Sequence, residues 1–147
     1  MNIQPFVVAP KNYPHPLNAI GVKVTVLASN VDTQGYEITV QEGDEGTGPP
    51  PHSHNWDESF YVLKGEVEFS YGDKTGVGVP GTLLHLPAGT VHGFRFGVGG
   101  GTLIEITGQG GSASKLFTNI DKEIPPGPPD IPKLIGVLKQ CGVSVAA

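Results

Sequence analysis

Short apolar runs that alternate with polar residues, each bounded by Gly or Pro, constrain the fold of this 147-residue chain most strongly. Residues 22–27 and 36–40 alternate with the period of two that a half-buried strand requires. Similar runs recur at 59–63, 66–71, 82–86, 91–96 and 102–107. The 22 Gly and 14 Pro fall between these runs, which is typical of tight turns rather than of low-complexity disorder. The pattern predicts an all-β domain, a closed or sandwiched antiparallel barrel.

The two ends of the chain differ from its middle. Residues 1–18 are rich in Pro and Asn and are expected to form an arm on the surface or on a partner subunit. Beyond the stiff spacer 125–129, the N-cap candidate Asp130, Pro132 in the first turn and Gly142 after the end predict one short amphipathic C-terminal helix. The predicted division is therefore an N-terminal arm (1–18), a barrel (19–124), and a spacer with a helix (125–147).

Charge and hydropathy exclude several classes of partner. The net charge is −5 without any basic block, so neither nucleic acid nor an anionic membrane surface is an expected partner. No apolar stretch has the length of a signal peptide core or of a bilayer span, which favours a cytoplasmic protein. The lone Cys141 fits a reducing compartment and is expected to be a buried helix residue rather than a nucleophile. The arm and the helix both need a surface to cover, which favours a homodimer.

His52 and His54 are the clearest chemical feature of the chain. They lie two residues apart, so in an extended segment both imidazoles leave the same face. With Glu58 and a downstream His92, they form a set that a divalent transition metal ion (Fe, Mn, Co, Ni, Cu or Zn) could collect. The alternative is that the histidines only fill polar positions, but four ligand-type residues at these spacings favour metal binding. His85 is out of phase with its apolar neighbours and is not an expected ligand.

Two gapped motifs around these residues resemble those of the cupin superfamily, over about residues 20–108. The first, G-x5-H-x-H-x3-E-x6-G, is met by Gly46, His52, His54, Glu58 and Gly65. The second, G-x5-P-x-G-x2-H-x3-N, is met by Gly81, Pro87, Gly89 and His92, with Phe96 where the family usually has Asn. The resemblance implies a double-stranded β-helix, or jelly-roll, barrel. It also implies a metal ion held by His52, His54, Glu58 and His92.

Strand alternation predicts which side chains surround the metal. If His92 points inward, so do Phe94 and Phe96, and Glu58 shares a face with Phe60 and Val62. A pocket lined by Phe60, Val62, Phe94 and Phe96 favours a small apolar or aromatic substrate. A sugar phosphate would instead require Arg or Lys, for which only Arg95 and Lys64 remain as rim candidates. The same rings could simply be core, because barrel interiors are apolar.

The ligand set combined with an apolar pocket resembles the quercetinase-like (quercetin 2,3-dioxygenase-type) cupins. That resemblance implies a metal-dependent dioxygenase that uses molecular oxygen on an electron-rich aromatic or enol substrate, with Glu58 as ligand and general base. The residues also allow a metal-assisted isomerase, cyclase or lyase, or a small-molecule-binding cupin without oxygen chemistry. The identity of the metal and of the substrate stays open.

Overall fold

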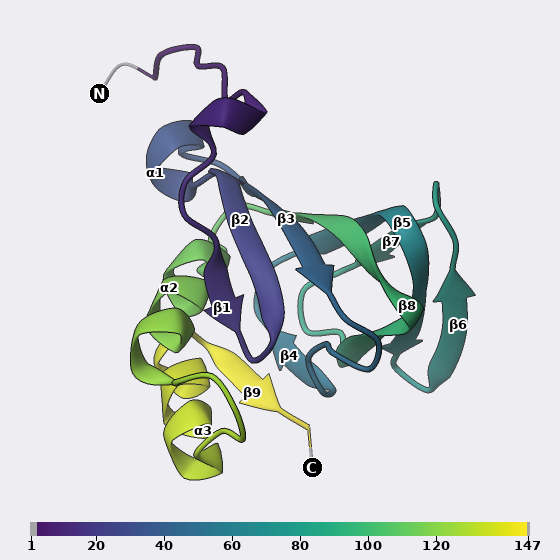
Figure 1. Cartoon of the computed structure of the whole chain (residues 1–147). Helices are drawn as coiled ribbons and strands as arrows, with labels where there is room; N and C mark the ends of the chain where they lie inside the picture. The colour runs from purple at the N-terminus through teal and green to yellow at the C-terminus, as the bar shows by residue number, and fades with distance from the viewer. Residues whose placement is uncertain (1–2, 147) are drawn as a thin grey trace.

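The computed structural model describes residues 3–146 and shows one strongly curled antiparallel sheet with helices against one side (Figure 1). Met1 and Asn2 of the predicted arm, and Ala147 of the predicted C-terminal segment, lie outside the described residues. The strands are β1 (Leu17–Ala19), β2 (Val22–Ala28), β3 (Glu37–Gly43), β4 (His52–His54), β5 (Glu58–Tyr71), β6 (Lys74–Gly78), β7 (Leu83–Leu86), β8 (His92–Thr107) and β9 (Val143–Val145).

Pairing of the two longest strands curls the sheet. The order along the main path is β1-β2-β3-β8-β4-β9, and β5 pairs with β6, β7 and β8. Strands β5 and β8 pair on both sides of a bend, where Gly65 lies opposite Gly101. A Cβ on Gly65, whose φ is +74°, would lie 2.2 Å from the Gly100 carbonyl oxygen, so the bend requires glycine. Lys64 and Gly65 lie between the predicted runs 59–63 and 66–71, where the sequence predicts a tight turn; that prediction is wrong, because both runs belong to β5, which bends without reversing.

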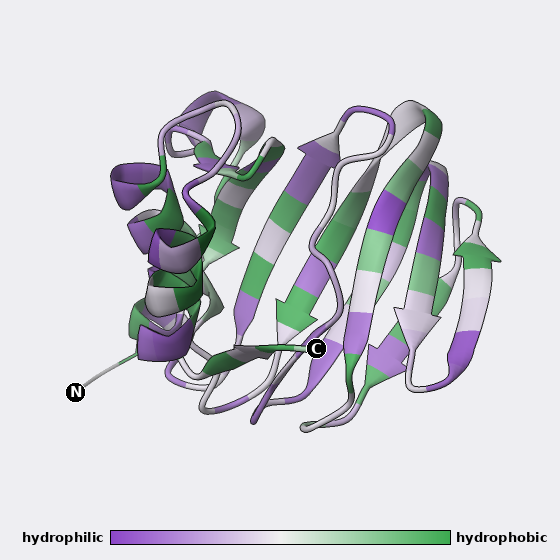
Figure 2. Cartoon of the chain, turned by 90° about the horizontal axis from the view of Figure 1, so that it is seen from below, coloured by the Kyte–Doolittle hydropathy of each residue, from purple (hydrophilic) through white to green (hydrophobic). Residues whose placement is uncertain are grey.

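Alternation along the strands builds the barrel core, as the apolar and polar bands in Figure 2 show. The core side chains come from the strands on all sides of the barrel. They are Val22, Val24, Phe60, Val62, Val67, Phe69, Leu86, Phe94, Phe96 and Leu103. The all-β jelly-roll prediction is confirmed.

The helices form a second layer with a core of its own. A 3-10 turn (Pro10–Asn12) and a short helix α1 (Asn30–Thr33) precede the longer helices α2 (Ala113–Glu123) and α3 (Ile131–Gln140). Helix α3 is the predicted C-terminal helix, and the Asp130 carboxylate caps it by accepting a hydrogen bond from the Lys133 N–H at 3.2 Å. Helix α2 was not predicted and lies in the range assigned to the barrel.

This second core joins the helices to the end of the barrel. It contains Trp56, Leu116, Ile120, Ile124, Val137, Cys141 and Val143. Cys141 is buried there as a free thiol. Among the described residues, no helix is both long and apolar enough to cross a membrane.

Candidate metal centre

Three strands bring the predicted ligands together at one end of the barrel. His52 and His54 lie on β4, Glu58 is the first residue of β5, and His92 is the first residue of β8. Strand β4 pairs with β8 so that His52 lies opposite His92. One ligand atom from each of the three histidines lies within 4.8 Å of the others. The predicted face-sharing of His52 and His54 thus brings both rings to His92, as the extended segment requires.

Each imidazole is fixed by a backbone carbonyl two residues away in the chain. His52 Nδ1 lies 2.8 Å from the Pro50 oxygen, His54 Nδ1 lies 3.1 Å from the Trp56 oxygen, and His92 Nδ1 lies 2.8 Å from the Thr90 oxygen. A carbonyl can only accept, so each Nδ1 carries a hydrogen, and Nε2 is the nitrogen that each ring offers to a metal ion once that nitrogen is deprotonated. This is the arrangement in which histidines bind metals, with the second nitrogen hydrogen-bonded outside the metal shell.

The Glu58 carboxylate meets two of these rings. Its Oε2 lies 2.8 Å from His54 Nε2 and 2.8 Å from His92 Nε2. The contact to His92 is close but lacks hydrogen-bonding geometry, so the buried His92 Nε2 has no hydrogen-bond partner among the described residues. A cation among these atoms would give each lone pair a partner. The donor set therefore fits a divalent transition metal ion.

Burial and charge set the protonation states of the cluster. Desolvation, reinforced by His92, lowers the pKa of His52 to about 4, so the His52 ring is neutral near pH 7. Burial disfavours ionised Glu58, but hydrogen bonds from Glu105 and His54 and the nearby His92 outweigh it and hold the pKa of Glu58 below its usual range. Burial also acts against protonated His92, yet the Glu58 carboxylate raises its pKa overall. A neutral imidazole and an ionised carboxylate are the forms that bind metals.

Glu105 is a site residue that the sequence reasoning missed. It lies on β8, is buried, and accepts a hydrogen bond from Thr39 Oγ1 at 3.2 Å. Burial, together with the adjacent Glu58 charge, raises the pKa of Glu105 well above its usual range. The signal was available, because Glu105 shares strand parity with Leu103 and Thr107 and so points inward with them.

A cavity of about 220 Å³ leads away from the ligands. His52, His54 and Glu58 are on its wall, together with Glu105 and Gln41. Its polar groups are confined to that end, and among the described residues that line it none is Lys or Arg. The arrangement suits a small ligand with one polar group and an apolar remainder.

The four side chains predicted to form the pocket wall divide into two pairs. Phe60 and Phe94 lie on the cavity wall, with ring centroids 5.3 Å apart. Val62 and Phe96 are buried in the barrel core and do not line the cavity. Phe96 packs against Phe94, deeper in the barrel, with centroids 5.4 Å apart.

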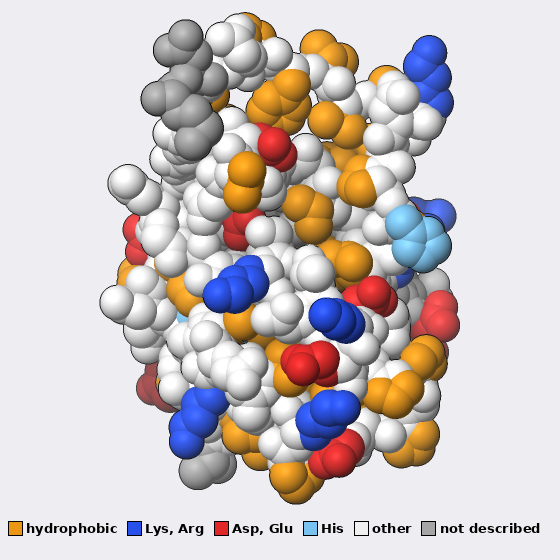
Figure 3. Space-filling view, turned by 90° about the vertical axis from the view of Figure 1, so that its left-hand side faces the viewer, with side chains coloured by type: hydrophobic (Ala, Val, Ile, Leu, Met, Phe, Trp, Pro, Cys, Tyr) orange, Lys and Arg blue, Asp and Glu red, His pale blue; other side chains and the backbone are white. Residues whose placement is uncertain are grey.

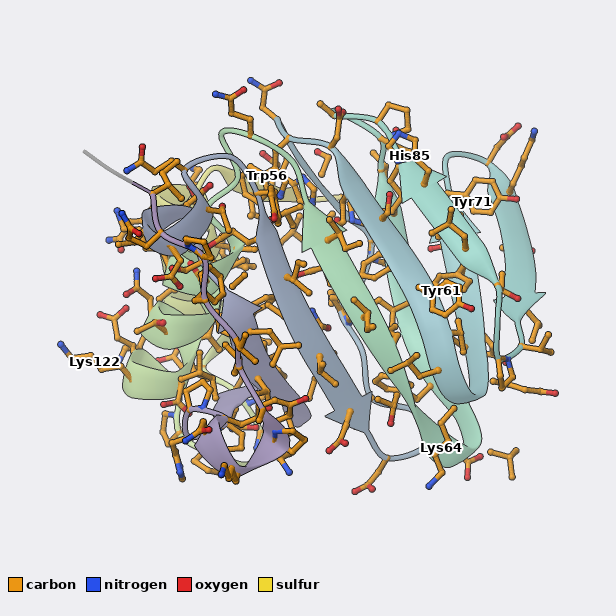
Figure 4. The ribbon with its side chains drawn as sticks, turned by 90° about the horizontal axis from the view of Figure 1, so that it is seen from above. Trp56, Tyr61, Lys64, Tyr71, His85 and Lys122 are labelled. Atoms are coloured by element: carbon orange, nitrogen blue, oxygen red, sulfur yellow. The ribbon has the colours of Figure 1, made fainter. Side chains whose placement is uncertain are left out.

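Trp56 closes the cavity beside the ligands. Its ring stacks on His54 with centroids 4.1 Å apart and an angle of 7° between the planes, and it lines the cavity. Figure 4 shows Trp56 between the helices and the barrel, whereas Lys64 lies at the opposite end of the molecule. Lys64 is thus no rim residue, and Arg95 lies outside the cavity lining. His85 lies on β7, where its Nδ1 is 2.9 Å from Ser59 Oγ, away from the cluster.

Comparison with known proteins supports this description. The cupin domain family matches residues 36–97, which include all four candidate ligands. Quercetin 2,3-dioxygenase of Bacillus subtilis is 36% identical over 73 residues, 48% of this chain but only 21% of the relative, so the chain spans about a fifth of that protein's length.

Solved structures share the fold at lower identity. A RmlC-like cupin from Shewanella frigidimarina has a TM-score of 0.64 at 20% identity, covering 74% of this chain and 95% of that one. The polyketide cyclase RemF from Streptomyces resistomycificus has a TM-score of 0.60 at 22% identity, covering 71% and 80%. The predicted resemblance is thereby confirmed: residues 36–97 match the cupin domain family, and the sheet around them has the cupin fold.

Proposed function

We propose that this protein is a metal-dependent dioxygenase that acts on an electron-rich aromatic or enol substrate. One observation carries the proposal: three oriented imidazoles and a carboxylate converge at the end of an apolar cavity, and no Lys or Arg is among the described residues that line it. The identity to quercetin 2,3-dioxygenase over 73 residues favours the same reaction class.

The residues around the cavity have distinct roles in this proposal. His52, His54, Glu58 and His92 would hold the ion, which supplies Lewis acidity and redox chemistry toward a substrate oxygen. Trp56, Phe60 and Phe94 exclude water and orient a flat substrate beside the cluster. Glu58 Oε2 accepts the hydroxyl proton when the substrate becomes an anion. In a dioxygenation both oxygen atoms enter the product and the substrate is the only reductant, so no added electron donor is required.

Metal analysis and oxygen uptake test the proposal together. Protein purified without added metal is analysed for its elements and then screened on an oxygen electrode with phenols and 1,3-diketones. We expect consumption of one O₂ per substrate. His92→Ala should remove the metal and lower the uptake by about 100-fold or more. The matched control, His85→Ala, alters an exposed histidine on β7 and should leave both unchanged.

Two outcomes overturn the proposal. Full turnover by metal-free protein would remove the metal from the reaction. Turnover unchanged under strict anaerobiosis would replace the dioxygenase by a metal-assisted isomerase, cyclase or lyase, because the same donors can polarise a carbonyl without oxygen. Tight binding of metal and ligand with no turnover of either kind would favour a small-molecule-binding protein.

We further propose that the chain forms a homodimer through its N-terminal arm. Ile3, Phe6, Val7 and Tyr13 expose large apolar side chains there. Figure 3 shows apolar side chains over the upper part of this face, and charged side chains mixed with apolar ones over its lower part. An apolar strip of this kind is typical of an interface.

A further inference from the structure

The cavity at the metal centre does not end inside the barrel. It continues between the β1–β2 hairpin and helices α2 and α3, where Val22, Leu116, Ile120, Leu134 and Leu138 form its walls. These residues lie outside the cupin motifs, since α2 and α3 follow β8 and Val22 on β2 precedes the first motif. The helical layer is therefore a wall of the candidate site as well as a cover for the barrel.

The wall of the cavity has a buried part beside Glu58 and an exposed part beside α3. Glu58, Phe60 and Glu105 are 4%, 2% and 5% exposed at the inner end. Ile20 in the β1–β2 turn and Ile131 on α3 are 38% and 53% exposed, and both line the cavity. The cavity thus opens to solvent beside α3, and its mouth is apolar.

The chemistry of the walls changes along the same direction. Aromatic side chains, Trp56, Phe60 and Phe94, surround the inner end, where the hydrogen-bonding groups also lie. Most of the outer wall is aliphatic, from Val22 to Leu138. Flat rigid walls match a planar ring, whereas branched aliphatic side chains accommodate a flexible hydrocarbon chain. The volume of about 220 Å³ lies below the roughly 300–1,000 Å³ of pockets for drug-sized ligands, so the chain must be short.

We propose that the outer part of this cavity is a binding channel for a short alkyl chain carried by the substrate. The substrate class is a compact electron-rich ring or enol that bears one such chain. Its polar head lies at the end of the cavity lined by His52, His54 and Glu58, and its chain runs outward between β2 and the helices. The identity of the polar head rests on the proposed function. The alkyl chain is inferred from the helical walls of the cavity alone.

A homologous series of 4-n-alkylcatechols, from methyl to hexyl, tests the channel on the intact metal-loaded protein. Binding is measured under nitrogen by calorimetry, so that no turnover interferes. Trp56 is the sole tryptophan and lines the cavity, so its fluorescence reports entry of the same ligands. Affinity should rise by up to about four-fold per methylene until the channel is full, and then level off. Equal affinity along the whole series would overturn the proposal.

A substitution in the helical wall tests whether the dependence of affinity on alkyl chain length arises in the channel. Leu134→Phe adds volume inside the channel and should abolish the gain for propyl and longer chains, with catechol itself bound as before. The matched control Leu83→Phe changes an exposed leucine on β7 and should retain the full dependence on chain length. An unchanged dependence in Leu134→Phe would place the chain elsewhere and refute the channel.

Failure of the channel and failure of the proposed function give different results. Chain-dependent binding with no oxygen uptake for any member, once air is admitted, would keep the channel and remove the dioxygenase. Oxygen uptake with no dependence of affinity on alkyl chain length would keep the dioxygenase and remove the channel.

Discussion

At the scale of single residues, the candidate centre is built from very short-range contacts. Every imidazole is oriented by a carbonyl only two positions away, so local backbone conformation aims the three Nε2 atoms before any ion arrives. Such preorganisation reduces the cost of ordering ligands on binding. The backbone just before His52 should therefore matter as much as the histidines themselves.

Gly48 tests that dependence. Its φ is +145°, and a Cβ there would lie 2.1 Å from the Phe94 carbonyl oxygen. Gly48→Ala must push residues 46–51 away from β8, so we expect a loss of about 2 kcal/mol or more in unfolding free energy and a weaker metal site. Chemical denaturation and metal titration measure the two effects.

Gly76→Ala is the matched control for Gly48. A Cβ on Gly76 would meet nothing within 4 Å, so this variant should differ from the parent by less than about 0.5 kcal/mol. Equal stability of the two variants would show that the approach of Gly48 to β8 is not required.

Strand alternation predicts which side chains point into the barrel, but not how deep in the barrel each of them lies. It correctly joined His52 with His54, and it placed Phe60, Phe94 and Phe96 inside the barrel, where all three are buried. It could not tell which ring faces the cavity, because depth depends on how the two bent strands cross. Glu105 was overlooked because the apolar residues on either side of it made the segment resemble an ordinary core strand.

At the scale of elements, one buried carboxylate ties helix α2 to the barrel. Glu37 begins β3 and is 1% exposed. It accepts hydrogen bonds from the Asn30 N–H and the Ser114 N–H, each at 3.0 Å, and from the Ser114 hydroxyl. Ser114 lies in the first turn of α2, where a negative charge also stabilises the helix dipole. Glu37 thus attaches the start of α2 to the sheet, and Asp121 further along α2 accepts a hydrogen bond from the Asn18 N–H of β1 at 2.8 Å.

Removing that carboxylate should loosen α2. Glu37→Ala leaves three donors without their acceptor, and we expect a loss of about 3 kcal/mol in unfolding free energy. The control Glu42→Ala removes an exposed carboxylate, 3.5 Å from Lys23 Nζ, and should cost less than about 1 kcal/mol. Denaturant titration followed by circular dichroism measures both. A similar small loss for Glu37→Ala would show that this carboxylate is not required to hold α2.

The elements that sequence reasoning found are those with strong local signals. Asp130, Pro132 and Gly142 mark the ends of α3 without reference to the rest of the chain. Helix α2 has weaker local signals. Its N-cap residue makes no side-chain capping hydrogen bond, and its buried face consists of Ala113, Leu116 and Ile120. From sequence alone, the bend at Gly65 resembles a turn. Whether the strand reverses there is decided by pairing with Gly101, which is distant in sequence.

At the scale of the whole molecule, two cores share one cavity. The barrel core contributes Phe60 and Phe94, the helical core contributes Trp56, Leu116 and Ile120, and the ligand cluster lies where they meet. The motifs that resemble those of cupins lie on the barrel strands β4, β5 and β8 and on the loops between strands. Selection among substrates should depend on both cores, because the outer walls come from the second.

Residues 3–7 of the N-terminal arm are exposed. Val7 is 93% exposed and Phe6 is 49% exposed, and exposure of such residues on one segment favours association of two copies about a two-fold axis. We expect light scattering after size-exclusion chromatography to give twice the chain mass of 15.4 kDa, and Phe6→Ser/Val7→Ser to give a monomer. The control Val98→Ser alters an equally isolated valine, 85% exposed, and should remain dimeric. A monomeric parent, or a dimer that survives the double substitution, would refute the role of the arm.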